Sequence, residues 1–231
     1  MKAAIMQPYF LPYIGYFQLM AAVDVFVAYD NIKYTKKGWI NRNRYLRNGA
    51  DATFGVPLRN DSDHLDIVQR EIAADFDRRR LLAQLREAYR KAPHFAETYP
   101  LAEAVVDAPA TNLFEFLLHG LTKVRDHLGL QTPILASSSI DADHSLRSQE
   151  RVIAIARSLG AQTYVNPIGG TELYSREAFA DAGLDLRFLR SRPIEYPQAG
   201  GAFVPWLSIL DVLMFNGADR THGLLSEHEL T

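Results

Sequence analysis

Short apolar segments alternate with helical segments along much of the chain, and this alternation is the feature that most restricts its fold. Residues 2–6 (KAAIM) are predicted to form a strand, residues 14–22 (IGYFQLMAA) a helix, and residues 23–29 (VDVFVAY) a second strand. The second strand is apolar on both faces, which is typical of a parallel strand covered by helices. The opening of the chain therefore predicts a βαβ unit.

The same alternation returns in the C-terminal part of the chain. It predicts strands at 132–139, 162–167 and 184–190, and helices at 146–160, 172–183 and 204–217. We expect Pro205 to begin the last helix and Gly217 to close it, because proline suits the first turn of a helix and glycine its end. The tail 219–231 shows little pattern.

The middle of the chain has a different pattern. Residues 31–58 alternate polar and apolar with turn signals at Lys37-Gly38 and Asn48-Gly49, which predicts an antiparallel meander. Further expected elements are a short strand at 67–72 and helices at 75–91, 94–106 and 111–130. We expect Asp75 to cap the first of these helices and Thr111 to cap the last. We therefore predict a single α/β domain over residues 1–231. It is a doubly wound, mainly parallel sheet with a β insertion at 31–58 and a helical excursion at 75–130.

The composition excludes several classes of site. The 231 residues contain no cysteine, which removes disulfides, zinc–thiolate sites, iron–sulfur clusters and a thiol nucleophile. There is no secretory signal and no apolar run of the roughly 20 residues that a membrane helix needs. A net charge of −2 gives no general attraction to nucleic acid. We expect a cytoplasmic, soluble protein without membrane insertion, nucleic-acid partner, metal or cofactor.

The loop QPYFLPYIGY, residues 7–16, is the strongest candidate for a binding site. Ligands of open parallel sheets bind outside the carboxyl ends of the strands, and this loop leaves the first strand there. We expect Gln7 and Tyr9 to bind substrate, and Tyr16 to donate a hydrogen bond to a developing oxyanion. The alternative is that the aromatic side chains of the loop only pack, but packing gives no use for Gln7 between a strand and a proline.

Longer motifs give the chain a family resemblance. It resembles the WbqC-like family in IMQPYFLPYIGYFQL, VDVFVAYDNIKYTKKGWINRNRY, YVNPIGGTELYSREAF and YPQAGGAFVPWLSILDVLMFNG, and the likeness covers nearly the whole chain. The resemblance implies bacterial genes that lie among those for surface polysaccharides, including O-antigen, and for other specialised metabolites. The activity it implies is transfer of acyl or aminoacyl groups onto amino sugars.

The opening also resembles that of nucleotidylyltransferases, in which a strand leads through a proline-containing loop to a His-x-Gly-His helix start. The corresponding residues here are Tyr13-Ile14-Gly15-Tyr16, so tyrosine stands in place of both histidines. Near neutral pH a tyrosine offers only a neutral hydroxyl, whereas a histidine can bring a positive charge to a phosphate. The substitution argues against nucleotidyl transfer, which stays only as an alternative.

The basic insertion carries a second group of candidates in WINRNR. Alternation along a strand places Trp39, Asn41 and Asn43 on one face, where a ring and two amides suit a sugar or an amide. We expect Arg42 and Lys36 to hold donor phosphates, since arginine binds phosphate through two parallel hydrogen bonds. A solvated basic strand without a ligand is the alternative.

Two aspartates bracket the second strand. Asp30 lies at its carboxyl end beside the opening loop, so we expect it to act as the general base toward an amine or a hydroxyl. Asp24 lies at the opposite end and is expected to be a structural cap.

The last helix and the loop before it supply further candidates. Ser208 and Asp211 share one face of a helix that is apolar nearly all round, so both are expected to be buried. They either bond to neighbouring backbone groups or close the site from the other side. In the second case Tyr196 and Gln198, which precede Gly200-Gly201, orient the acceptor.

Two functions remain open at this point. The first is a transferase that moves an acyl or aminoacyl group from an activated donor to an amine, by direct attack because the chain has no cysteine. The second is a binding module for a carrier-linked or nucleotide-linked intermediate. Asp30 facing one cavity with Arg42 and Gln198 would favour the enzyme, and a cavity of aromatics and amides with no ionisable group would favour the binder. The expected partner is a small-molecule or carrier-linked substrate, and a homodimer is left open.

Overall fold

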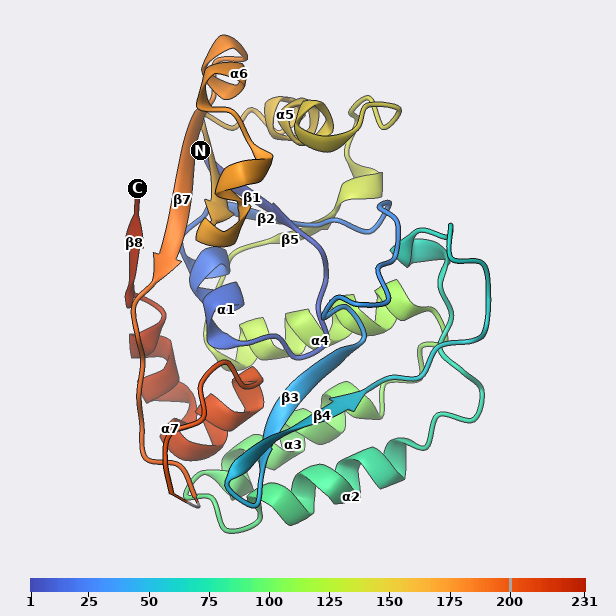
Figure 1. Cartoon of the computed structure of the whole chain (residues 1–231), viewed down its shortest axis with the longest axis vertical. Coiled ribbons are helices and arrows are strands. Elements are labelled where there is room, and N and C mark those ends of the chain that lie inside the picture. The colour runs from blue at the N-terminus through green and yellow to red at the C-terminus, as the bar shows by residue number, and fades with distance from the viewer. Residues whose placement is uncertain (200) are drawn as a thin grey trace.

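A six-stranded, mainly parallel sheet forms the centre of the structure (Figure 1), a computed structural model that describes residues 1–199 and 201–231. The strand order is β5-β2-β1-β6-β7-β8, and only the β7–β8 pair is antiparallel. The strands are β1 (Lys2–Met6), β2 (Val25–Ala28), β5 (Ile134–Ala136), β6 (Thr163–Pro167), β7 (Asp185–Ser191) and β8 (His228–Leu230). The predicted α/β class with a mainly parallel sheet is confirmed.

The first strand lies in the middle of the sheet, which decides where a ligand can enter. β1 pairs in parallel with β2, with Ala3 opposite Val25, and in parallel with β6 on its other side. The adjacent, parallel placement of the first two predicted strands is therefore confirmed. The chain builds outward from β1 in one direction through β2 and β5, and then in the other through β6 and β7. Such a reversal opens a crevice at the carboxyl ends of the two central strands.

Helices cover both faces of the sheet, as the doubly wound class requires. Ala4 and Phe26 belong to a large core that also contains residues of α1, α4 and α7. Their neighbours Ile5 and Val27 belong to a smaller core with residues of α5 and α6, because successive strand residues point to opposite faces. The helices are α1 (Ile14–Ala21), α2 (Arg78–Tyr89), α3 (Phe95–Val106), α4 (Leu113–His127), α5 (Ser148–Ser158), α6 (Arg176–Asp181) and α7 (Ile209–Leu224). Among the described residues, no helix is long and apolar enough to cross a membrane.

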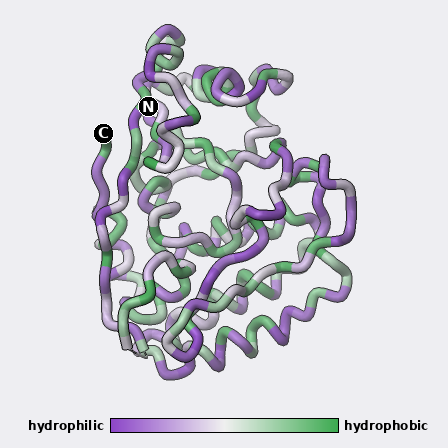
Figure 2. The backbone as a smooth tube through the Cα atoms, in the orientation of Figure 1, coloured by the Kyte–Doolittle hydropathy of each residue, from purple (hydrophilic) through white to green (hydrophobic). Residues whose placement is uncertain are grey.

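The β insertion is a hairpin and not a longer meander. Its strands are β3 (Arg42–Arg47) and β4 (Ala50–Gly55), which pair antiparallel around a two-residue turn. Asn48 and Gly49 form this turn with φ of 53° and 77°, the conformation that a two-residue hairpin favours. The residues of β3 are mostly hydrophilic (Figure 2). Trp39 and Asn41 precede the strand, so the prediction that they alternate with Asn43 on one strand face is wrong.

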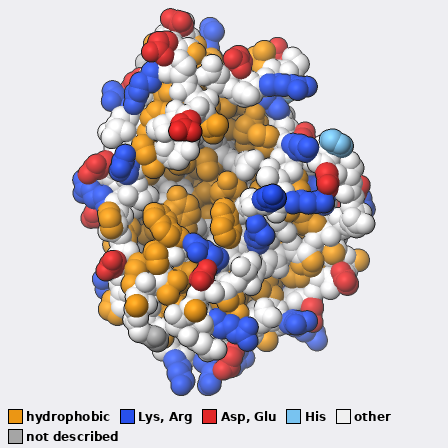
Figure 3. Space-filling view, viewed as in Figure 1, with side chains coloured by type: hydrophobic (Ala, Val, Ile, Leu, Met, Phe, Trp, Pro, Cys, Tyr) orange, Lys and Arg blue, Asp and Glu red, His pale blue; other side chains and the backbone are white. Residues whose placement is uncertain are grey.

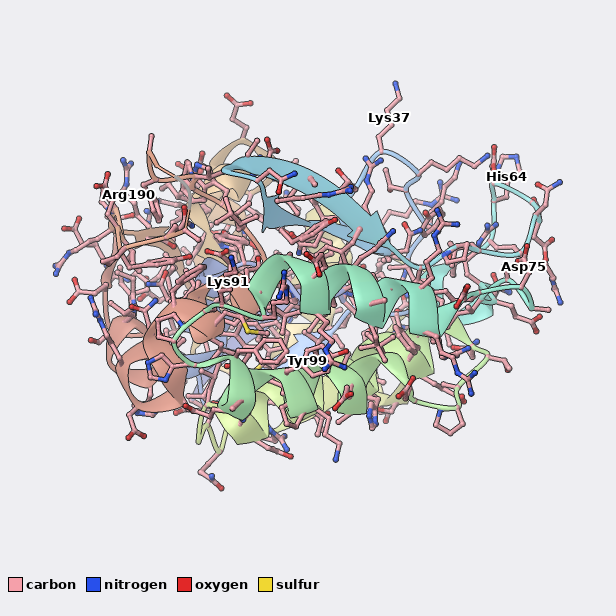
Figure 4. All side chains as sticks on the ribbon, turned by 90° about the horizontal axis from the view of Figure 1, so that it is seen from below. Lys37, His64, Asp75, Lys91, Tyr99 and Arg190 are labelled. Carbon is pink, nitrogen blue, oxygen red and sulfur yellow. The ribbon has the colours of Figure 1, made fainter. Side chains whose placement is uncertain are left out.

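Three other local expectations between residues 67 and 130 are corrected. The segment 67–72 begins with a 3₁₀-helix, Ile67–Gln69, and only isolated bridges follow, because Asp66 and Gln69 form a capping box that starts a helical turn. Asp77 caps α2 in place of Asp75, and Asn112 caps α4 in place of Thr111. Helices α2 and α3 lie side by side when the molecule is seen from below (Figure 4), and Tyr99 of α3 donates to the Leu82 carbonyl of α2 at 3.3 Å.

The last helix starts later than predicted, and a second helical segment follows its predicted end. Ser208, and not Pro205, is the residue that caps α7. Gly217 has φ 73° and ψ 175°, which are not helical values, so it ends the first segment of α7 as expected. A second helical segment then continues to Leu224, and the Glu97 carboxylate accepts the Ala218 N–H at its start at 3.0 Å. The tail, in which we expected little structure, pairs its strand β8 with β7.

Candidate functional site

The opening loop is held in place by side chains from two distant segments. Leu11 has φ 44°, an uncommon value for a residue other than glycine. Its carbonyl accepts from Asn43 Nδ2 of the hairpin at 2.9 Å and from Ser208 Oγ at the start of α7 at 2.8 Å. Asn43 also donates to the Phe10 carbonyl at 3.1 Å. The loop is therefore tied to the hairpin and to α7, so these three segments meet beside the carboxyl end of β1.

A pocket of about 270 Å³ lies where the three segments meet, and we call it the aromatic pocket. Its two tryptophans come from far apart in the sequence, yet Trp39 is 42% exposed and Trp206 is 62% exposed. Tyr13 packs edge-on against Trp206, with ring centroids 5.9 Å apart. The pocket is lined by Tyr9, Pro12, Tyr13, Trp39, Asn43, Arg44 and Trp206.

Two guanidinium groups lie over the Trp39 ring, each 5.6 Å from its centroid. Arg44 forms an ion pair with Asp51 at 3.2 Å and donates to the Trp206 carbonyl at 3.1 Å. Arg42 donates to the carbonyls of Gly38 and Lys37 at 3.0 and 2.9 Å, and it takes part in none of the ion pairs formed by the described residues. The Arg42 charge is therefore left without a carboxylate to balance it.

A second, larger pocket of about 470 Å³ adjoins the first, and we call it the apolar pocket. Tyr13 and Trp206 line both pockets, so this pair of rings forms the wall between them. Hydrophobic side chains gather in the hollowed middle of this face of the molecule, with Lys and Arg side chains beside them (Figure 3). The remaining lining residues are Ile14, Ser191, Arg192, Pro193, Ile194, Glu195, Tyr196, Phe203, Pro205, Leu207 and Val212.

A buried carboxylate lies behind the apolar pocket. Asp211 has no solvent exposure and accepts hydrogen bonds from Tyr89 Oη at 2.9 Å, Tyr196 Oη at 2.7 Å and Gln198 Nε2 at 2.7 Å. Burial raises the pKa of Asp211, although the hydrogen bonds from the three donors oppose this shift. Burial raises the pKa of Tyr196 as well, and the neighbouring Asp211 charge adds to the rise. Tyr196 is therefore a neutral donor, and Asp211 joins α7 to α2 and to the loop before α7.

Asp30 lies in a separate, closed environment. It is fully buried, and its carboxylate accepts from Ser137 Oγ at 2.7 Å, Ser138 N at 2.9 Å and Ser138 Oγ at 2.5 Å. These serines follow β5, the strand next to β2. The structure thus joins Asp30 to the carboxyl end of β5 and not to Arg42 or Gln198.

The structure brings some of the predicted site residues together and separates others. Tyr9, Trp39 and Asn43 line the aromatic pocket, and Tyr196 lines the apolar pocket. In the described structure the side chains of Gln198 and Asp211 bond to each other behind the apolar pocket, and that of Ser208 bonds to the opening loop. Gly200, expected beside Gln198 in a glycine loop, lies outside the described residues.

Three further predicted residues line neither of the two pockets. Tyr16 is buried and donates to the backbone carbonyl of Gln7 at 3.0 Å, while the Gln7 side chain accepts from Tyr9 Oη at 3.3 Å. Lys36 is exposed and pairs with Asp63 at 2.6 Å. Its neighbour Lys37 extends away from the body of the molecule (Figure 4).

Sequence reasoning missed Tyr13, Arg44 and Trp206 as members of the site. Trp206 directly follows Pro205, and the prediction that Pro205 begins the last helix places this tryptophan inside the helix. The helix begins only after Ser208, so Trp206 lies in the loop before it. Trp206 has φ 62°, which holds it in the loop and turns it out of the helix. A helix predicted to start after the Ser208 cap would leave Trp206 in the loop at the site.

The comparisons with known proteins extend over nearly the whole chain. The sequence model of the WbqC-like protein family matches residues 7–222. The chain is also similar to the Uncharacterized protein Rv1507c of Mycobacterium tuberculosis, with 29% identity over 221 residues that cover 94% of this chain and 95% of the relative. No solved structure gives a significant match. The family match spans the opening loop, the hairpin and most of α7, so the chain belongs to the WbqC-like protein family.

Proposed function

We propose that the protein binds a small molecule that joins a ring to an anionic group, such as a sugar phosphate or a nucleotide-linked intermediate, in the aromatic pocket. The observation that carries this proposal is the meeting of two exposed tryptophans from distant segments beside two guanidinium groups. An aromatic face stacks on a sugar or a base, and a guanidinium binds phosphate through charge-assisted hydrogen bonds. The charge of Arg42 supports an anionic ligand, because it forms no ion pair with a carboxylate of the described residues.

The polar groups of the aromatic pocket favour binding over chemistry. Its lining includes Arg44 and Asn43 but no carboxylate among the described residues. Asp30, the expected base, is held by serines elsewhere. Asn43 donates both amide hydrogens to carbonyls of the opening loop, and its amide oxygen accepts the backbone N–H of Arg44 at 2.8 Å. Because its polar atoms are already bonded, Asn43 shapes the pocket.

Intrinsic fluorescence tests the proposal directly, because the chain has only two tryptophans and both line the aromatic pocket. We expect members of a panel of nucleotide sugars, nucleoside triphosphates and acyl thioesters to change the emission and to raise the melting temperature together. In Trp39→Phe the emission comes from Trp206 alone, and in Trp206→Phe it comes from Trp39 alone. The two variants therefore report separately whether the ligand contacts each tryptophan. Ligands that stabilise the protein without changing the emission would place binding elsewhere and contradict the proposal.

The Tyr13 ring gives a second, more local test. A Cβ at Gly15 would lie 2.3 Å from Tyr13 Cε2, so Gly15→Ala must displace this ring. We expect binding in the fluorescence titration to weaken by about 0.5–1.5 kcal/mol, the strength of one aromatic contact, with little loss of stability because only a side chain moves. Gly223→Ala is the matched control, since a Cβ there has no atom within 4 Å. Equal affinity in both variants would show that Tyr13 does not touch the ligand.

A transferase that moves an acyl or aminoacyl group from an activated donor to an amine is the second candidate. Tyr196 favours it, because its side chain lines the apolar pocket while its hydroxyl donates to Asp211 at 2.7 Å. The amine nitrogen would form a bond to the acyl carbon, and the bond from that carbon to the carrier would break, so that the carrier leaves with the electron pair. Tyr196 would take the proton of the amine and pass its own hydroxyl proton to Asp211, whose raised pKa favours accepting it. Release of the donor's carrier in the presence of an amine, and not in its absence, would establish this activity.

Asp30 is the alternative base to Tyr196 in this second candidate function, and Tyr16 is its proposed oxyanion donor. Both would have to exchange their present hydrogen bonds for bonds to the substrate. We place either function in surface-polysaccharide or specialised-metabolite biosynthesis, as membership of the family suggests. We place it in the cytoplasm because a chain without cysteine suits a reducing compartment.

A further inference from the structure

The apolar pocket has a composition that the proposed ligand of the aromatic pocket does not explain. Its volume of about 470 Å³ exceeds that of its neighbour and falls in the range of small-molecule sites. Aliphatic and aromatic side chains make up most of its wall, including Ile14, Ile194, Phe203 and Leu207. A sugar or a phosphate gains little from such a wall, whereas a hydrocarbon chain gains free energy with every methylene it buries.

The charges around the two pockets fix the orientation of a ligand that fills both. Arg192 at the rim of the apolar pocket is paired with Glu227 and Glu229 at 3.6 and 3.3 Å, and Glu195 adds a further negative charge there. The balance of charge at the rim of the apolar pocket is therefore unfavourable for binding an anion. The Arg42 guanidinium, which has no carboxylate partner among the described residues, lies over the ring of Trp39, and Trp39 lines only the aromatic pocket.

We infer that the ligand is an amphiphile, in which an aliphatic chain occupies the apolar pocket and is joined past Tyr13 and Trp206 to the anionic, ring-bearing group in the aromatic pocket. This inference rests on the proposed function and adds the chemical class of the second half of the ligand. The two pockets share Tyr13 and Trp206, so one molecule can touch both without crossing the protein core.

Chain length is the variable that tests this inference. We use two series with tryptophan emission as readout: coenzyme A thioesters from acetyl to palmitoyl, and n-alkyl phosphates of matching length. Each added methylene is expected to tighten binding about fourfold, the equivalent of about 0.8 kcal/mol, until the pocket is filled and the gain stops. A gain in the thioester series alone assigns a thioester-linked chain, and a gain in the phosphate series alone assigns a lipid phosphate.

Ile194→Glu places a charge in the apolar pocket and spares the aromatic one, because Ile194 lines only the former. We expect this variant to bind the shortest members like the wild type and to lose the gain with length. Ile153→Glu is the matched control, a half-buried isoleucine on α5 that lines neither pocket, and it should keep the gain.

The outcomes separate the inference from the proposed function. Short members that bind with an affinity independent of chain length would overturn the inference and leave the proposed function standing. A gain with length that survives in Ile194→Glu would overturn the placement of the chain. Failure of nucleotide sugars, triphosphates and both series to change the emission would overturn the proposed function itself. If Ile194→Glu does not fold, the wild-type series still decides the inference.

Discussion

Asp211→Ala is expected to lower the free energy of unfolding by about 2–4 kcal/mol. The substitution removes the acceptor of three hydrogen bonds and leaves the hydroxyls of Tyr89 and Tyr196 buried without it. It also releases the loop before α7, which forms much of the apolar pocket, so the chain-length dependence of binding should disappear with it. Urea denaturation, followed by titration with the longest ligand that binds the wild type, measures both effects.

Asp185→Ala is the matched control for this variant. Asp185 pairs with Arg187 at 2.7 Å, but both side chains are about half exposed, at 48% and 47%. Exposed pairs contribute about 0–1 kcal/mol, so this change should be close to neutral. Similar stability of Asp211→Ala and Asp185→Ala would mean that the buried network does not stabilise the fold.

The raised pKa of Asp211 adds a pH dependence with a definite sign. Because the carboxyl binds a proton more readily in the folded chain, the folded state holds more protons between the ordinary value of about 3.9 and the raised pKa. The contribution of Asp211 to stability is therefore full below the ordinary value and is lost as the pH rises through the folded pKa. Measured against Asp211→Asn, the wild type should lose part of its advantage over the pH interval that begins at about 4 and extends through the raised pKa. An advantage that grows over this interval would contradict the direction of the shift.

Asp30→Ala is expected to cost about 2–3 kcal/mol of unfolding free energy. Its carboxylate accepts from Ser137 and Ser138, and it joins the ends of β2 and β5 without any solvent exposure. Removing it leaves the buried Ser137 hydroxyl, and the backbone N–H and hydroxyl of Ser138, to find other acceptors. Thermal melting of the variant beside the wild type measures the loss.

Asp24→Ala provides a control at the other end of the same strand. Asp24 is exposed and accepts one bond, from Lys2 N at 2.7 Å, so its removal should cost about 1 kcal/mol or less. If Asp30→Ala melts like the wild type but abolishes a transferase activity, the carboxylate is a base, and the structural reading of Asp30 fails.

Much of the fold could be predicted from local patterns because they depend on near neighbours in the chain. The apolar runs of β1 and β2 and the helix between them predicted the parallel pair at the centre of the sheet. Asn48-Gly49 predicted a hairpin turn because this pair accepts positive φ at both positions. The helix boundaries failed where a better cap lay a few residues away, as at Ser208 for α7.

The candidate site was predictable in place but not in detail. Parallel strands gather their following loops at one edge, so the sequence placed the site at the carboxyl end of β1 and included Tyr9, Trp39 and Asn43. It also predicted that Asp211 and Ser208 would be buried, since their helix is apolar on nearly every side.

The sequence by itself determined which segments are strands and helices, and at which edge of the sheet the loops collect. Only the tertiary structure decided which partners the polar side chains take. Asp30 bonds to serines 107 and 108 residues away, and Asp211 bonds to Tyr89 across 122 residues. The reason is physical: a buried polar group must satisfy its hydrogen bonds with whatever the packing brings next to it. That neighbour is set by how distant elements pack, and no local pattern of the sequence contains it.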